Sequence, residues 1–304
     1  MSSVAASLRV WAEMVKLSHS VFALPFALIA AFLAGRNIDG RGWPFLGQLA
    51  LIVVCMVSAR SVAMTFNRIV DSQLDALNPR TAGRPLPSGR LSRAAAYAML
   101  VLSVITFGVG CVGFFVLYDN AWPILLSGPV LVYLCFYSFC KRFTKWSHFV
   151  LGSAIAISPV ASWLAIDPDS LGASAILLAL AVTCWIGGFD IIYSCQDIEA
   201  DRKQRLFSLP SKLGARRALW IARGAHVLCI ASLGVLGITA SLGVLYAIGL
   251  GIAATLLFVE NALVRADDYR HVNLVFFTIN GVVSIVLATG AIVDVLLQAS
   301  GPVG

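Results

Sequence analysis

Long stretches free of charged residues divide this chain. Eight stretches contain no Asp, Glu, Lys or Arg, namely residues 17–35, 42–59, 94–118, 120–140, 147–166, 170–189, 224–259 and 272–293. A helix needs about 20 apolar residues to cross the hydrocarbon core of a bilayer. Seven stretches have the length for one crossing, and 224–259 has the length for two if Arg223 and Glu260 lie at helix ends. We therefore expect nine transmembrane helices, with a turn at residues 241–243.

The composition agrees with an all-α polytopic membrane protein. Hydrophobic residues make up 59% of the chain and charged residues 12%, whereas a soluble domain has about 25% charged residues. This excludes a soluble enzyme, a disordered chain and a disulfide-stapled secreted module. The seven Cys residues form no C-x-x-C pair and lie within or beside the spans, as small core residues do. We interpret residues 1–304 as a single transmembrane domain.

The basic residues predict the orientation in the membrane. The chain has 22 Lys and Arg against 15 Asp and Glu, and cytoplasmic loops of membrane proteins are rich in Lys and Arg. With the N-terminus inside, 19 of the 22 fall in the cytoplasmic segments 1–17, 67–93, 141–147, 196–223 and 265–271. Two, Arg36 and Arg41, fall in outer segments, and the remaining one, Arg60, lies within the second span. We expect an N-in/C-out protein of the bacterial cytoplasmic membrane, with the basic loops in the cytoplasm. The excess of positive charge is then a matter of topology and predicts no nucleic-acid partner.

The N-terminal segment has a separate pattern. Val4, Leu8, Trp11 and Val15 recur at helical spacing ahead of the first span. Such a segment is typical of a helix that lies along the membrane interface. We expect residues 1–16 to form this interfacial helix.

Two rows of acidic residues close the second and sixth predicted spans. Asn67, Asp71 and Asp75 are spaced four residues apart, which places them on one face of a helix. The second row holds Asp190, Asp197 and Asp201, with Tyr193 predicted on the same helix face. The predicted active-site loops are 67–93 and 196–217. Ionisable side chains at membrane depth are costly and usually face a cavity, so we expect the rows to line one.

The residue types in these rows favour a hard cation. Five carboxylates repel one another unless a cation lies between them, and Mg²⁺ is typically held by carboxylates together with substrate phosphate oxygens. Two facing rows would clamp a diphosphate through Mg²⁺, and nearby bases would take the remaining phosphate charge. The bases considered are Arg68, Arg84, Lys141, Arg142, Lys203 and Lys212. A single Asp-x-x-x-Asp is more often a solvated helix face, but two rows at one membrane side argue against that interpretation.

These motifs resemble those of the UbiA superfamily of intramembrane prenyltransferases. The first signature is similar to the sequence from Asn67 through Asp75 and on through Asn78-Pro-Arg80 to Gly89. The second is similar to the sequence from Asp190 to Asp201, and the family's basic loop after the fourth helix is similar to residues 137–144. The resemblance runs from Lys16 through the ninth span, and the combination is far more specific than either row alone.

The resemblance implies a nine-helix bundle around a central cavity capped by the two acidic loops. It also implies Mg²⁺-dependent transfer of a polyprenyl chain from its diphosphate to an aromatic acceptor. Asn67, Asp71 and Asp75 match the family's first metal–diphosphate site, and Asp190, Asp197 and Asp201 the second, with Tyr193 on the cavity face. We expect two Mg²⁺ ions, one for each row, bridged by the diphosphate. Arg68 departs from the acidic or small residue of many relatives, which leaves its role open.

Parts of the second motif are similar to the branch of 4-hydroxybenzoate polyprenyltransferases. These parts are residues 189–199 and 206–214. That branch includes enzymes of ubiquinone synthesis and enzymes that prenylate an aminofutalosine-type acceptor on a menaquinone route. The sequence does not separate the two acceptors.

Several residues near the motifs are candidates for contacts with the substrates. Arg60, one helical turn before the first row, and His148 are candidates for binding an acceptor carboxylate or phenol. Aromatic side chains can stabilise an allylic cation by cation–π contact, although ordinary packing is the more frequent role. The aromatic residues considered are Phe66, Tyr133, Phe136 and Tyr137.

Two other classes of membrane protein compete with this interpretation. A transporter with acidic cation sites also fits nine spans, but here the acids lie at one membrane face rather than at the midplane. A metal-dependent phosphatidyltransferase ranks lower because the chain lacks an Asp-Gly followed by Ala-Arg at the spacing such enzymes use.

Overall fold

The computed structural model describes residues 2–15, 22–36, 38, 41–270 and 272–300, and the regular structure in this part is helical. Eight segments are long and apolar enough to cross a membrane. They comprise α3 (Leu46–Leu77), α4 (Arg93–Tyr118), α5 (Trp122–Cys140), α6 (Ser147–Ile166), α7 with its extension (Ala173–Lys203), α10 (Ala215–Thr239), α11 (Val244–Leu263) and Phe277–Ala299. A shorter apolar helix, α2, spans Leu24–Gly35. The first five residues of the first predicted span, 17–21, lie outside the described residues, so nine spans remain a prediction.

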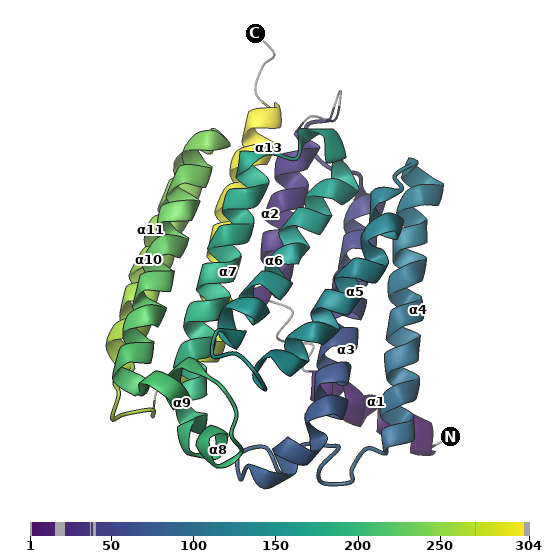
Figure 1. Ribbon diagram of the computed structural model, residues 1–304. Coiled ribbons are helices and arrows are strands. Elements are labelled where there is room, and N and C mark those ends of the chain that lie inside the picture. The colour runs from purple at the N-terminus through teal and green to yellow at the C-terminus, as the bar shows by residue number, and fades with distance from the viewer. Residues whose placement is uncertain (1, 16–21, 37, 39–40, 271, 301–304) are drawn as a thin grey trace.

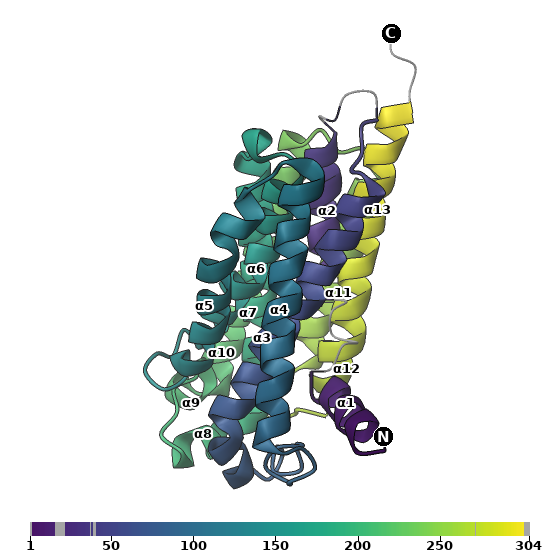
Figure 2. The same ribbon diagram turned by 90° about the vertical axis from the view of Figure 1, so that its right-hand side faces the viewer.

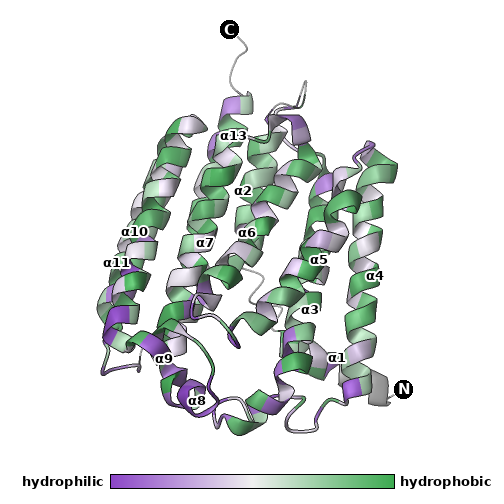
Figure 3. Ribbon diagram, in the orientation of Figure 1, coloured by the Kyte–Doolittle hydropathy of each residue, from purple (hydrophilic) through white to green (hydrophobic). Residues whose placement is uncertain are grey.

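The long helices lie side by side in one bundle, with α10 and α11 at one edge and α4 at the other (Figure 1). Helix α6 packs along α7, α7 along α10, and α3 along α4. The lateral surface of the bundle is mostly hydrophobic, and hydrophilic residues gather at the end that carries α8 (Ile198–Lys203) and α9 (Leu209–Leu213) (Figure 3). The outer faces of α4 and α11 carry exposed Val, Leu, Ile and Phe side chains, as expected of surfaces that contact lipid.

The two ends of the described chain lie at opposite ends of the bundle. Helix α1 (Ser2–Val15) lies at the same end as α8, and α13 (Asn280–Ser300) finishes at the other (Figure 2). This arrangement is compatible with an odd number of crossings. The side of the membrane to which each end belongs remains a prediction.

Helix α7 forms the centre of the core. Trp185 is fully buried, and its ring meets Phe26 at 5.0 Å and Phe189 at 5.2 Å between centroids. Its indole Nε1 donates a hydrogen bond to Asn280 Oδ1 at 2.6 Å, where a π-helical turn (Val275–Ile279), preceded by the short α12 (Val272–Leu274), leads into α13. A buried indole N–H needs such a partner. This core fixes α7, and therefore the start of the second acidic row.

The ends of three helices can be compared with the boundaries expected from the sequence. Residues 67–77 belong to α3, so the first active-site loop is confined to residues 78–92. Helix α7 ends at Ser194 and a 3-10 turn (Cys195–Asp197) precedes α8, so the expectation that Asp190 and Asp197 share the face of one helix is wrong. The turn predicted at 241–243 is confirmed between α10 and α11, with Ser241 at a φ of 49°.

Candidate active site

The first row lies on the inner face of α3. Asn67, Asp71 and Asp75 are 8%, 2% and 5% exposed. The amide of Asn67 donates a hydrogen bond to Asp71 Oδ2 at 3.1 Å. The four-residue spacing therefore does place these side chains on one face, and that face is turned inward.

Basic side chains from two loops and from α3 itself neutralise this row. Lys141 Nζ lies 2.5 Å from Asp71 Oδ2, and Arg142 Nη2 lies 2.9 Å from Asp71 Oδ1. Arg84 Nη1 lies 2.6 Å from Asp75 Oδ1, and Arg68 Nη1 is 4.0 Å from Asp75 Oδ2. Buried carboxylates require such partners. Thus four of the six predicted bases lie at the first row, namely Arg68, Arg84, Lys141 and Arg142.

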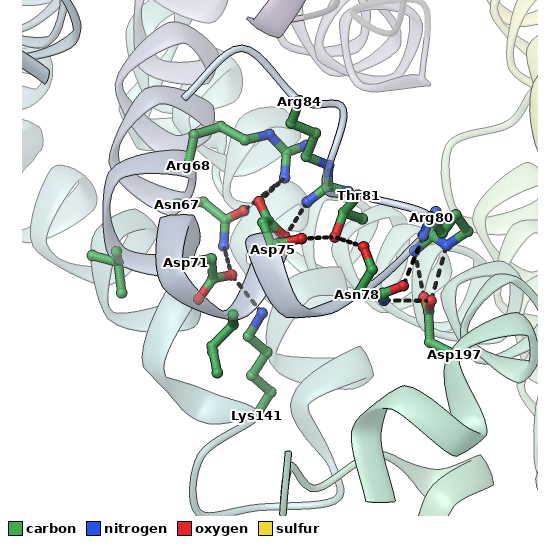
Figure 4. Close-up of polar contacts among 12 residues, drawn as sticks. Asn67, Arg68, Asp71, Asp75, Asn78, Arg80, Thr81, Arg84, Lys141 and Asp197 are labelled. Carbon is green, nitrogen blue, oxygen red and sulfur yellow. Dashed lines mark hydrogen bonds and ion pairs between the residues drawn. The ribbon is translucent and has the colours of Figure 1, made fainter. Parts of the chain in front are cut away.

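The two rows are joined by residues that our sequence reasoning did not assign to the site. Arg80 Nε donates to Asp197 Oδ1 at 2.9 Å, and its Nη2 also bonds Asp197 Oδ2 (Figure 4). Its Nη1 donates to the Tyr193 hydroxyl at 2.8 Å. Asn78 Nδ2 donates to Asp197 Oδ1 at 3.0 Å. Burial alone would lower the pKa of Arg80, but its bonds to Asp197 outweigh burial and raise that pKa. The only sequence signal for this link was the Asn-Pro-Arg run after the first row.

The remaining acids of the second row are bonded by a His and a Ser side chain. Asp190 Oδ2 lies 2.7 Å from His148 Nδ1, and Asp201 Oδ2 accepts a hydrogen bond from the Ser208 hydroxyl at 2.7 Å. His148 Nε2 also accepts from the backbone N–H of Leu209 at 3.3 Å. Because protein groups use both of its ring nitrogens, His148 offers no free nitrogen to an acceptor. These contacts therefore do not support the candidate role of His148 in binding the carboxylate or phenol of the aromatic acceptor.

The two rows line one polar cavity of about 310 Å³. Its wall includes Asn67, Asp71, Asp75, Asp190, Tyr193, Asp197 and Asp201, with Arg68, Arg84 and Lys141. A second, apolar cavity of about 190 Å³ lies between α2, α3, α4, α5 and α6. Arg60, Met64, Tyr137, Leu151 and Ile155 line both cavities. A polar chamber therefore adjoins an apolar one at the level of Arg60.

Some predicted residues lie elsewhere. Lys203 and Lys212 are absent from the cavity wall among the described residues, and Lys212 Nζ lies over the Phe207 ring, 4.0 Å from its centroid. Of the four aromatic candidates, only Tyr137 lines either cavity. Phe66 packs on Phe139 and Phe136 on Phe143, and the Tyr133 hydroxyl is bonded to Ser153 at 2.7 Å. These three have ordinary packing roles.

The oxygen-rich wall suits a hard divalent cation. Among the described residues no group of three or more His, Cys, Asp or Glu lies assembled in metal-binding geometry. However, Asp75 Oδ2 is buried and has no hydrogen-bond partner, with Arg68 Nη1 4.0 Å away, and a buried carboxylate oxygen of this kind can take a directly bound cation. Carboxylate and amide oxygens are the ligand types Mg²⁺ accepts, with phosphate oxygens completing its shell. Asn67, Asp71, Asp75, Asp197 and Asp201 therefore fit such an ion.

Comparisons with known sequences agree with this geometry. A family model described as the UbiA prenyltransferase family matches residues 23–282. A 4-hydroxybenzoate octaprenyltransferase from Hahella chejuensis is 31% identical over 235 residues, covering 77% of this chain and 76% of the relative. A protein of the same description from Serratia proteamaculans is 35% identical over 167 residues, 55% of each chain. The chain thus matches about half the length of that second relative.

Solved structures show the same fold. The apo structure of a UbiA homolog from Aeropyrum pernix K1 matches with a TM-score of 0.78 and 28% identity, covering 91% of this chain and 98% of the other. A UbiA homolog from Archaeoglobus fulgidus bound to GPP and Mg²⁺ matches with a TM-score of 0.67, covering 95% and 99%. Because this homolog is only 16% identical to the chain, the similarity concerns the fold alone.

Proposed function

This chain belongs to the UbiA prenyltransferase family, and from that premise we propose that it transfers a polyprenyl group from polyprenyl diphosphate to 4-hydroxybenzoate or a related aromatic quinone precursor. An aminofutalosine-type acceptor is the alternative within the same chemistry. One observation gives this proposal its strongest support. Two carboxylate rows from distant parts of the sequence line one polar cavity, and this cavity adjoins an apolar one.

The polar cavity has the chemistry to hold a diphosphate. Asn67, Asp71, Asp75, Asp197 and Asp201 would hold Mg²⁺, with one ion at each row. When bound, the metal neutralises charge that develops on the leaving diphosphate. Arg68, Arg84, Lys141 and Arg142 then exchange part of their pairing with the acids for phosphate oxygens. Charge-assisted bonds of this kind are strong, and they favour ionisation of the allylic C–O bond.

The apolar cavity has the chemistry to hold the prenyl chain. Its wall includes Met56, Ala63, Phe107, Leu126 and Ala161, which offer no hydrogen bond to water. An apolar wall keeps water away from the allylic cation, so that the ring carbon of the acceptor attacks instead. Tyr137 lies where the two cavities adjoin, and its ring is placed to stabilise the cation by cation–π contact.

Arg60 is our proposal for the residue that binds the acceptor carboxylate. It lines both cavities, and its Nε is buried without a hydrogen-bond partner. A buried guanidinium nitrogen without a partner is costly, and a carboxylate satisfies it with a strong bond. Tyr193, Asp190 and the Asp197–Arg80 pair line the polar cavity together with Arg60.

We further propose that the polar end faces the cytoplasm of a bacterial inner membrane and that residues 1–16 lie along the interface. The concentration of Lys and Arg in the loops of this end supports the orientation. The indole of Trp11 donates to the Thr65 hydroxyl at 3.0 Å, which ties α1 to α3 beside the first row.

Product analysis tests the proposed reaction. Membranes containing the protein are incubated with Mg²⁺, labelled polyprenyl diphosphate and either 4-hydroxybenzoate or a futalosine-type acceptor, and the product is identified by mass. We expect a prenylated acceptor and release of diphosphate. Counterflow of solute into proteoliposomes without diphosphate release would contradict the proposal and favour a transporter.

A further inference from the structure

One buried imidazole contacts Asp190, at one end of the second acidic row, and the segment whose Ser208 bonds Asp201 at the other end. His148 is the second residue of α6, and only 4% of its side chain is exposed. Its Nδ1 lies 2.7 Å from Asp190 Oδ2 on α7, and its Nε2 lies 3.3 Å from the backbone nitrogen of Leu209, the first residue of α9. Three elements, α6, α7 and α9, thus meet at this ring.

The partners define the protonation of the ring. A carboxylate accepts hydrogen bonds and a backbone N–H donates them. Nδ1 must therefore carry the proton given to Asp190, and Nε2 must present its lone pair to Leu209. Both bonds exist together only in the neutral imidazole with the proton on Nδ1.

The Leu209 contact leads on to Asp201. Ser208 is the N-cap of α9, and its hydroxyl accepts from the Ser211 N–H while donating to Asp201 Oδ2 at 2.7 Å. The next residue towards the N-terminus, Phe207, donates its N–H to the Lys141 carbonyl at 2.7 Å. The carboxylate of Asp201 is therefore held by a segment that His148 anchors directly.

We propose that His148 is a positioning residue that sets the orientation of Asp190 and Asp201 within the cavity. This inference rests on the proposed binding of a metal diphosphate between the two rows. The Asp190 side chain is 25% exposed, so His148 holds one carboxylate oxygen while part of the group still faces the cavity. Groups that orient the primary ligands of a metal or diphosphate site have large effects, commonly about 10- to 100-fold when they are removed.

Two substitutions separate the two bonds. In His148→Asn the amide nitrogen can take the place of Nδ1 and donate to Asp190, while the acceptor for Leu209 is lost. In His148→Gln the amide oxygen can take the place of Nε2, while the donor to Asp190 is lost. His148→Ala removes both bonds. His226→Asn serves as a matched control, because His226 is also buried but lies between α7, α10 and α11, bonded to Asn261.

Binding of geranyl diphosphate with Mg²⁺ to the purified full-length protein gives the deciding readout. We expect His148→Ala to raise the Kd at least about tenfold. His148→Asn and His148→Gln each keep one of the two bonds, so each should recover part of that loss and leave the Kd about threefold above the wild-type value. His226→Asn is expected to keep the wild-type Kd even where it lowers the melting temperature. A purely structural role of His148 would instead lower stability without this graded rescue.

Different results contradict the positioning role of His148 and the proposed function. A Kd within twofold of wild type for His148→Ala overturns the positioning role. Where the Ala variant does not fold, wild-type affinity in both the Asn and the Gln variant overturns it equally. A wild-type protein that binds geranyl diphosphate but prenylates neither acceptor contradicts the proposed function. In that case the Kd values of the His148 variants still decide whether His148 is a positioning residue. A wild-type protein that binds no geranyl diphosphate contradicts both the proposed function and the positioning role of His148.

Discussion

The guanidinium of Arg80 bonds both carboxylate oxygens of Asp197, although the two residues are 117 positions apart. Arg80 belongs to the loop after α3, and Asp197 ends the 3-10 turn after α7. This pair fastens the loop of the first row to the second row, and the side chains of Arg80 and Asp197 are 32% and 14% exposed. The polar cavity therefore depends on a contact between two loops as well as on the packing of helices.

Removal of Arg80 should weaken diphosphate turnover. We expect Arg80→Ala to lower kcat/KM for polyprenyl diphosphate by about 100-fold, as loss of an electrostatic donor at a site of developing charge commonly does. Arg80→Lys should recover little, because an ammonium cannot reproduce the two-pronged guanidinium bond. Steady-state kinetics in purified protein measure this. The exposed Arg270, which pairs with Asp268 in its own loop, is the control; Arg270→Ala should keep wild-type kinetics.

Loss of either row should abolish transfer without unfolding the protein. Asp71→Ala and Asp197→Ala each remove a carboxylate that faces the cavity, and we expect no detectable product with labelled polyprenyl diphosphate and Mg²⁺. Asp71 is bonded by Lys141 and Arg142, so its removal also leaves two bases without their acid. Monodisperse extraction in detergent checks that each variant is folded. Turnover retained in either variant would refute the roles of the rows.

Arg60 should control acceptor binding rather than diphosphate binding. Arg60→Met keeps much of the side-chain volume and removes the guanidinium whose Nε is unpartnered. We expect KM for 4-hydroxybenzoate to rise by about 10- to 100-fold, in line with the loss of a charge-assisted bond. The Kd of geranyl diphosphate with Mg²⁺ should change less than threefold. An equal rise in both constants would show that Arg60 acts on the diphosphate.

Filling the apolar cavity should shorten the chain that the enzyme accepts. Ala161 lines this cavity, and Ala161→Phe places a ring in it. We expect turnover of long polyprenyl diphosphates to fall at least tenfold relative to geranyl diphosphate, because cavity walls are too closely packed to yield to such a volume change. Competition between the two substrates in one reaction measures the ratio. Val109→Phe, on the exposed face of α4, should leave the ratio unchanged.

The sequence alone determined the class of the molecule and much of the site. Uncharged stretches predicted transmembrane helices, because the cost of burying charge in hydrocarbon leaves few other solutions. The regular spacing of Asn67, Asp71 and Asp75 placed them on one face, and α3 confirms this. Helical periodicity failed for Asp190 and Asp197, because the helix they were assigned to ends at Ser194.

Only the tertiary structure decided which charges meet. Local sequence patterns report the direction of a side chain on its own helix, whereas ion pairs such as Arg80 with Asp197 depend on how separate loops fold onto one another. The same limit explains Lys203 and Lys212, which are close to the second row in sequence yet absent from its cavity wall. It also explains His148, whose two bonds to α7 and α9 become visible only when the three elements pack together.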